Sequence, residues 1–96
     1  MPTVIRTSRA IEDLKEIVAF IAYDDLAAAC NWLTEIESLF ELLSTQPSMG
    51  IQLKSRQYGK IRRFARGNYL VYFRAIGSGV EILRVLHGAR DHRGLI

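Results

Sequence analysis

The spacing of the apolar residues changes once along this chain, at Gly50. Before it, apolar residues recur every three or four positions, from Ile11 to Ile21 and again from Ala29 to Leu43, which is the period of an amphipathic helix. After it, apolar runs are short, rich in β-branched and aromatic residues and separated by glycines, as in β-strands. Helices and strands that occupy separate parts of one chain are typical of the α+β class. The sequence therefore predicts a small sheet packed against a pair of helices.

The order of the elements follows from local signals. Thr7 or Ser8 can cap the first helix, and Asp24 or Asp25 the second, because their side-chain oxygens accept first-turn N–H groups. The link between the helices is short, so we expect an antiparallel pair. The last two strands are apolar on both faces and joined by Gly-Ser-Gly, which predicts a hairpin in the centre of the sheet. The predicted strands lie at 3–6, 60–64, 68–76 and 80–87.

Chain length and composition limit the remaining possibilities. A chain of 96 residues and 10.9 kDa has room for one core, so we expect a single domain over residues 1–96. Apolar stretches such as 17–23 are shorter than the roughly 20 residues of a membrane helix, and we expect a cytoplasmic protein with no membrane partner. Cys30 is the only cysteine, which excludes an intramolecular disulfide, and its apolar helical neighbours predict a buried packing role.

Charge is strongly segregated along the chain. Residues 1–50 carry three Lys or Arg and eight Asp or Glu residues, whereas residues 51–96 carry ten and two, for a net charge of +3. Such asymmetry within one small domain indicates a basic face that meets a polyanion, either nucleic acid or an acidic protein segment. Two histidines five positions apart, with one aspartate nearby, do not form a zinc-binding pattern, so we predict no metal and no cofactor.

Four segments carry a resemblance to a known family. In order they are TSRAIEDLKEIVAFIA, QPSMG, IRRFARGNYLVYFR and GVEILRVLHGARD, and together they span Thr7 to Asp91. This chain resembles the RelE/ParE toxin superfamily of bacterial type II toxin-antitoxin systems, and its GNYLVYFR and RVLHGARD segments are most similar to the ParE branch. The resemblance implies a β-α-α-β-β-β fold, with a mainly antiparallel sheet against an antiparallel helix pair.

The resemblance also implies a function. Members arrest growth and are neutralised by a cognate antitoxin from the adjacent gene, here a ParD-like protein in a hetero-oligomer. ParE-branch members, which include plasmid-stabilization toxins, poison DNA gyrase, whereas RelE-branch members are endoribonucleases that cut mRNA inside the ribosome. We expect a ParE-like gyrase inhibitor, with a RelE-like nuclease as the alternative and a non-toxic co-repressor module as a third hypothesis. The fold alone cannot choose among them.

The RelE-like catalytic pattern is incomplete in this sequence. Lys60 and Arg62 match the two basic residues of the second strand, and Arg90 matches the arginine after the last strand. Tyr69 stands where the third-strand arginine would be, and the C-terminal tyrosine is missing. His87 is a candidate proton carrier, since histidine titrates near neutral pH, although packing beside Tyr69 or Tyr72 or capping the last strand is the more ordinary role. The nuclease candidates are therefore Lys60, Arg62, His87 and Arg90.

A wider set of residues is predicted to contact the target or the antitoxin. Strand alternation should place Arg62 and Arg63 on opposite faces. Arg84 and Arg74 interrupt apolar strands, so each should have a carboxylate or carbonyl partner, and the acidic N-terminal half can supply it. After Gly88 the tail can turn, so that Arg90 reaches Lys60 and Arg62 with Asp91 as its orienting partner. The candidates are Lys60, Arg62, Arg63, Arg66, Tyr69, Arg84, Arg90, Asp91, Arg93 and Trp32, with Phe20, Tyr23 and Leu42 as further apolar positions that an antitoxin helix can cover.

Overall fold

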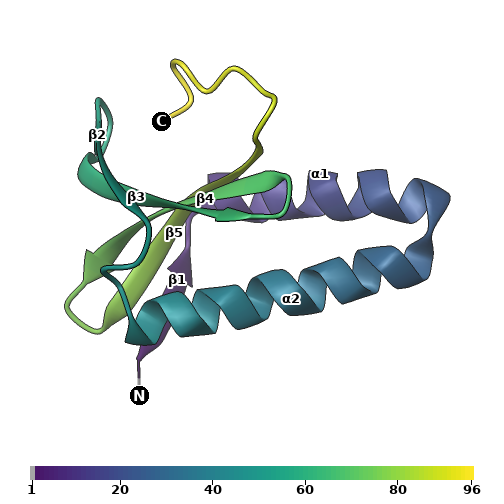
Figure 1. Ribbon diagram of the computed structural model, residues 1–96, viewed down its shortest axis with the longest axis horizontal. Coiled ribbons are helices and arrows are strands. Elements are labelled where there is room, and N and C mark those ends of the chain that lie inside the picture. The colour runs from purple at the N-terminus through teal and green to yellow at the C-terminus, as the bar shows by residue number, and fades with distance from the viewer. Residues whose placement is uncertain (1) are drawn as a thin grey trace.

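A computed structural model describes residues 2–96 (Figure 1). The α+β class and the predicted order of the elements are confirmed, with one strand more than the sequence delimited. That strand, β2, is short and mostly exposed, and its IQLKS sequence carries a weak apolar signal. The elements are β1 (Thr3–Arg6), α1 (Ser8–Asp24), α2 (Leu26–Thr45), β2 (Ile51–Ser55), β3 (Gly59–Arg66), β4 (Tyr69–Ile76) and β5 (Gly79–His87).

The five strands form one sheet in the order β1-β5-β4-β3-β2. Strands β2 to β5 form an antiparallel meander, while β1 pairs in parallel with β5 because the helix pair carries the chain across the sheet. The hairpin of β4 and β5 is central, as its apolar sequence predicts. Strand β2 forms the outer edge, farthest from β1 in the strand order.

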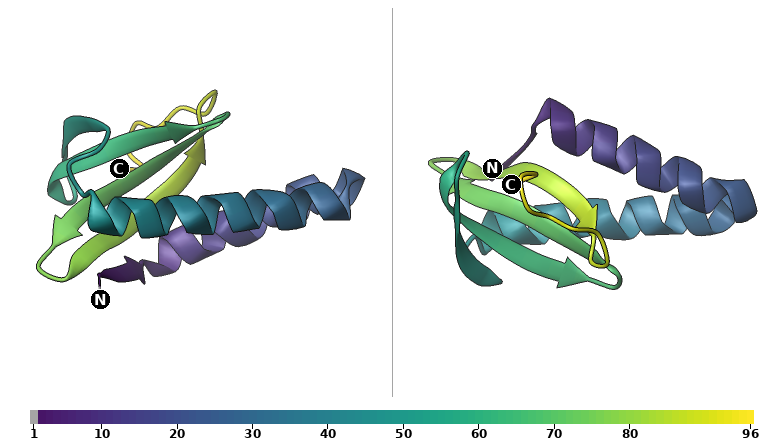
Figure 2. Two further views of the ribbon diagram at one scale, coloured as in Figure 1. Left: turned by 60° about the horizontal axis from the view of Figure 1, so that its bottom comes forward. Right: turned by 90° about the horizontal axis from the view of Figure 1, so that it is seen from above.

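The helices form the antiparallel pair expected from their short link. Figures 1 and 2 show α1 and α2 side by side along one side of the sheet, with their connected ends projecting beyond it. Thr7 caps α1 by accepting the N–H of Ala10 at 3.0 Å, and Asp25 caps α2 by accepting that of Ala28 at 3.1 Å. Asp25 alone separates the helices, and its own N–H still donates to Ile21. The helices therefore reverse direction within a single residue.

Both faces of the sheet are covered by apolar contacts. Towards the helices, Phe40 of α2 and Phe73 of β4 lie in the main core, fully buried. On the other face, Tyr72 and Leu83 belong to a second buried cluster, against which Leu95 of the C-terminal segment packs. This arrangement explains why β4 and β5 are apolar on both faces.

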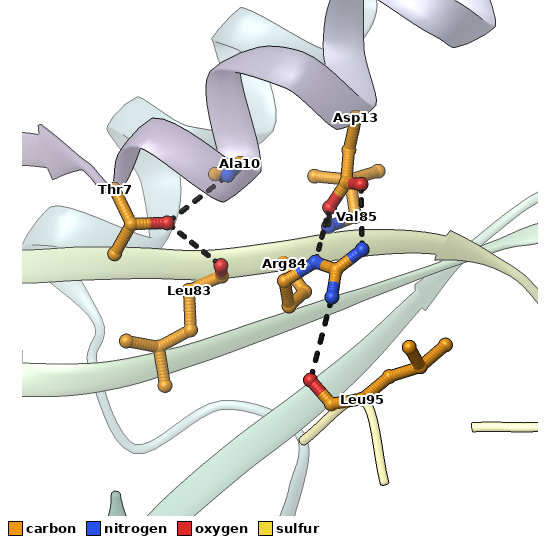
Figure 3. Close-up of polar contacts among 7 residues, drawn as sticks. All are labelled: Thr7, Ala10, Asp13, Leu83, Arg84, Val85 and Leu95. Atoms are coloured by element: carbon orange, nitrogen blue, oxygen red, sulfur yellow. Dashed lines mark hydrogen bonds and ion pairs between the residues drawn. The ribbon is translucent and has the colours of Figure 1, made fainter. Parts of the chain in front are cut away.

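A buried ion pair joins α1 to β5 (Figure 3). Asp13 and Arg84 are each only 5% exposed, and their bidentate contacts measure 2.7 and 2.8 Å. The same carboxylate accepts the backbone N–H of Val85 at 3.0 Å. A β-bulge leaves Leu83 without a partner in β4 and pairs Arg84 with Tyr72. Hydrogen bonding to Asp13 raises the pKa of Arg84 above its ordinary value.

The expected carboxylate partners are therefore present for both strand arginines, but from different sources. Asp13 comes from the acidic N-terminal half, as predicted. Arg74 instead pairs with Glu81 of the neighbouring strand, at 2.7 Å.

The predicted burial of Cys30 is wrong. Its neighbour Ala29 is buried at 1% exposure, and a helix turns about 100° per residue, so Cys30 points to solvent. Neither helix of the described chain, residues 2–96, is long and apolar enough to cross a membrane.

Replacing Asp13 with alanine should destabilise the fold strongly, because it leaves the Arg84 guanidinium buried without its counter-charge. We expect the free energy of unfolding, measured by urea denaturation, to fall by about 3 to 5 kcal/mol. The exposed neighbour provides a matched control, and Glu12→Ala should change it by less than about 0.5 kcal/mol. A loss below about 1 kcal/mol for Asp13→Ala would contradict this role.

Candidate interaction surfaces

Two of the predicted basic residues line one hollow near the outer edge of the sheet. Lys60 and Arg62 border a cavity of about 290 Å³ together with Gln52, Tyr58 and Arg74. Arg62 donates to the backbone carbonyl of Gly50 at 3.2 Å. The guanidinium of Arg74 lies 5.3 Å from the centre of the Tyr58 ring. The hollow thus gathers three cations and a phenol.

Arg63 and Arg66 lie apart from this hollow. Arg63 pairs in the sheet with Tyr72, on the face opposite to Arg62, as alternation predicts. Arg66 lies at the far end of β3 and forms an exposed ion pair with Glu35 of α2 at 3.0 Å. Only some of the β3 cations therefore share one surface.

A second hollow is mainly apolar and lies between α1 and the end of β5. It has a volume of about 270 Å³ and is bordered by Ile17 and Phe20 of α1, Tyr69 of β4, Val85 to His87 of β5, and the three charged residues Asp13, Glu16 and Arg90. We call this the α1–β5 groove. It combines an apolar floor with charged groups of both signs.

Aromatic contacts fix the side chains at one end of this groove. The Tyr69 ring meets Trp32 of α2 edge-on, with 5.3 Å between ring centres, and meets His87 edge-on at 5.2 Å. The Nδ1 atom of His87 accepts the N–H of Ala89 at 3.0 Å. The predicted packing of His87 beside Tyr69 is confirmed, and this imidazole is occupied by a structural contact.

After β5 the tail turns back over the sheet. Gly88 donates to the Asn68 carbonyl at 2.7 Å, and Arg84 donates to the Leu95 carbonyl at 3.4 Å. Ser55 of β2 donates to the carbonyl of Ile96. The tail thus closes over the second apolar cluster.

His92 holds the middle of this tail, a role that sequence reasoning missed. Its ring contacts the hydroxyl of buried Tyr72 at 2.5 Å through Nδ1 and the carbonyl of His87 at 2.8 Å through Nε2. The only signal in the sequence is general: a buried tyrosine hydroxyl needs a polar partner.

The structure does not bring Arg90 to Lys60 and Arg62. Arg90 borders the α1–β5 groove, as does His87. His87 pairs with Tyr69 of β4, and Tyr69 pairs in turn with Arg66 of β3, so this end of the sheet is the end of β3 at Arg66. Lys60 is six residues from Arg66 along β3, which corresponds to about 20 Å. The nuclease candidates therefore fall into two separate groups.

Three further candidates, Asp91, Arg93 and Arg84, have structural partners within the protein. Asp91 pairs with Arg93 at 2.9 Å rather than orienting Arg90, and hydrogen bonds from Arg93 lower the pKa of Asp91. Arg84 is buried in its pair with Asp13, so it positions α1 and the tail instead of facing solvent. Residues 2–96 contain no group of three or more His, Cys, Asp or Glu side chains arranged to hold a metal ion.

Comparison with known proteins identifies the family. The model described as "ParE toxin of type II toxin-antitoxin system, parDE" matches residues 4–92. Toxin ParE1 of Caulobacter vibrioides is 36% identical over 69 residues, covering 69% of this chain and 70% of that protein. Toxin RelE1 of the same bacterium is 28% identical over 91 residues, covering 90% and 92%.

A solved structure shows the same fold. It is titled "Chromosomal ParDE TA system from P. aeruginosa" and matches with a TM-score of 0.69 at 22% identity, covering 91% of this chain and 96% of that chain. With a family model that spans nearly the whole sequence, the chain belongs to the ParE toxin family of type II toxin-antitoxin systems.

Proposed function

We propose that this protein arrests bacterial growth by poisoning DNA gyrase and that a ParD-like antitoxin, encoded beside it, neutralises it. The match of the ParE family model over residues 4–92 carries this proposal. The basic second half of the chain suits a target assembly that contains DNA. Gyrase acts on chromosomal DNA, so we place the protein in the cytoplasm.

The arrangement of the candidate catalytic residues supports gyrase over the ribosome. Cleavage of RNA at the 2′-hydroxyl needs a proton acceptor, cations for the developing phosphorane charge and an acid for the leaving oxygen, all around one phosphate. Lys60 and Arg62 can supply the cations, but Arg90 and His87 lie in the other hollow. The site therefore lacks the histidine that would serve as base.

One observation still favours the endoribonuclease as the second candidate. The match to Toxin RelE1 covers 90% of this chain, whereas the match to Toxin ParE1 covers 69%. Tyr58 and Arg74 border the same hollow as Lys60 and Arg62 and could act there as acid and additional cation. On this alternative, messages from induced cells would show new ends inside codons.

A gyrase assay separates the two candidates. The purified protein should inhibit supercoiling of relaxed plasmid by gyrase and should increase the amount of cleaved DNA trapped with the enzyme. Adding the antitoxin should reverse both effects, which controls for non-specific DNA binding. Absence of both effects at saturating protein, together with new message ends in primer extension, would replace the gyrase proposal by the nuclease.

For the antitoxin, we propose docking in the α1–β5 groove. Phe20 is 77% exposed and borders the groove together with the apolar side chains of Ile17 and Val85, so its ring extends an apolar surface that a partner can cover. Arg90 is exposed beside it and offers a cation to a carboxylate. An acidic amphipathic segment, of the kind expected of the antitoxin, matches both features.

The Phe20→Asp variant should weaken antitoxin binding, because it places a carboxylate at an apolar contact next to Glu16. We expect a loss of about 2 kcal/mol or more, roughly thirtyfold in affinity, measured by isothermal titration calorimetry. Leu26→Asp is the matched control, since Leu26 is similarly exposed on the helix pair, at 68%, but does not border the groove. Equal affinities for the two variants would exclude the groove as the docking site.

A further inference from the structure

The hairpin of β2 and β3 has an unusual charge. Residues 51–66 contain six Lys or Arg residues and no Asp or Glu. Basic residues on an edge strand discourage strand pairing between molecules, which accounts for Lys54 of β2 but not for the four cations of β3, an interior strand. We call this segment the basic ribbon; its cations are Lys54, Arg56, Lys60, Arg62, Arg63 and Arg66.

The register of the ribbon places like charges directly opposite each other. Lys54 of β2 pairs with Lys60 of β3, and both side chains are exposed. Side chains at opposed positions lie about 5 Å apart, and like charges there destabilise a sheet. Arg62 lies two residues further along the same face. Apart from protecting the edge of the sheet, this arrangement costs stability, and an anion bound between the cations would relieve the repulsion.

The rest of the protein does little to neutralise these charges. Across residues 2–96, Arg66 is the only one of the six with a carboxylate within ion-pair distance, from Glu35. Arg62 donates only to a backbone carbonyl, that of Gly50. Beside Lys60 and Arg62 lies the hollow of about 290 Å³, which is open to solvent. The ribbon therefore presents cations and a recess to an external anion.

We infer that the basic ribbon binds the phosphate backbone of double-stranded DNA. Sites for single-stranded nucleic acid combine cations with exposed aromatic rings on which bases stack. Both aromatic residues of the ribbon are engaged: Tyr58 is half-buried and stacked by Arg74, and half-buried Phe64 packs on the main core. Cations without a stacking platform fit a duplex, whose bases are turned inward.

The position of the ribbon also suits a duplex. Strand β2 is the outer edge of the sheet, and Figure 1 shows the hairpin at the side of the molecule away from the projecting end of the helix pair. Strand β3 pairs with β4 only from Arg62 onward, so the tip of the hairpin, which carries Lys54 and Lys60, is two-stranded. A two-stranded antiparallel ribbon is narrow enough to enter the major groove of DNA, which is about 12 Å wide. This inference rests on the proposed function for its biological role, because gyrase holds a DNA segment that the ribbon could contact.

Direct DNA binding can be measured without gyrase. A fluorescent duplex of about 20 base pairs is titrated with the protein at salt concentrations from about 50 to 200 mM, and anisotropy gives the affinity. The wild type should bind with a log–log salt slope near −3, corresponding to about three phosphate contacts. Lys54→Gln/Lys60→Gln should reduce the slope by about two and weaken binding about tenfold or more at the lowest salt.

The matched control removes two exposed cations from α1. Arg9→Gln/Lys15→Gln has the same net charge as the ribbon variant and should bind nearly as the wild type does. The melting temperature of the ribbon variant should not fall, because the substitutions remove a repulsion. Equal weakening by the two variants, or no measurable duplex binding by the wild type, would overturn the inference.

Three further results separate this inference from the RNA alternative and from the proposed function. Tighter binding of single-stranded RNA of the same length, with the same loss in the ribbon variant, would replace duplex DNA by RNA as the ligand. Duplex binding without gyrase inhibition would remove the proposed function and keep the ribbon. Gyrase inhibition without duplex binding would keep the proposed function and remove the inference about the ribbon.

Discussion

The buried pair of Asp13 and Arg84 holds three parts of the molecule together. Strand β1 ends at Arg6, opposite Ile82, so the edge of β5 beyond that point has no strand partner. There, side chains of α1 and of its cap replace the missing strand: the Asp13 carboxylate accepts the N–H of Val85, and the Thr7 hydroxyl donates to the Leu83 carbonyl. Arg84 then reaches past the sheet to the tail. Removing either charge would leave the other buried without a partner, which is far more costly than never having had the pair.

This pair is one of three ion pairs that share a pattern. Arg84 binds Asp13, Arg66 binds Glu35, and Arg6 binds Glu37; each time the carboxylate comes from a helix and the arginine from the sheet. The segregation of charge along the sequence is therefore partly an attraction between two layers of the fold. It leaves an excess of cations on the basic ribbon: Glu35 of α2 pairs with Arg66, but within residues 2–96 the other five cations have no carboxylate within ion-pair distance. The position of a cation therefore shows whether a helix carboxylate pairs with it or whether it is available to a partner. Composition alone does not distinguish the two.

Sequence reasoning succeeded where the signal is local. Apolar spacing predicted the helix pair, and the strands on either side of Gly-Ser-Gly predicted the central hairpin. Each helix cap was predicted as one of two residues, and the structure selects Thr7 and Asp25. Sequence reasoning failed where the outcome depends on distant contacts. The tail leaves β5 through the hydrogen bond of Gly88 to Asn68 and is held by His92 on Tyr72. Arg90, which lies between these contacts, borders the α1–β5 groove instead of approaching Lys60. No pattern near Arg90 reveals those contacts.

The distance between the α1–β5 groove and the basic ribbon constrains how the proposed antitoxin can neutralise the protein. The α1–β5 groove lies at the end of the sheet near His87, and the Lys54–Lys60 pair lies about 20 Å away along β3. An antitoxin segment confined to the groove would leave the ribbon exposed and the protein still attracted to DNA. Under the proposed function, neutralisation would then come from blocking gyrase at the groove itself, or from an antitoxin long enough to follow the sheet to the ribbon. An extended chain spans this distance with about six residues, so a short acidic extension beyond the docked helix is enough for the second route.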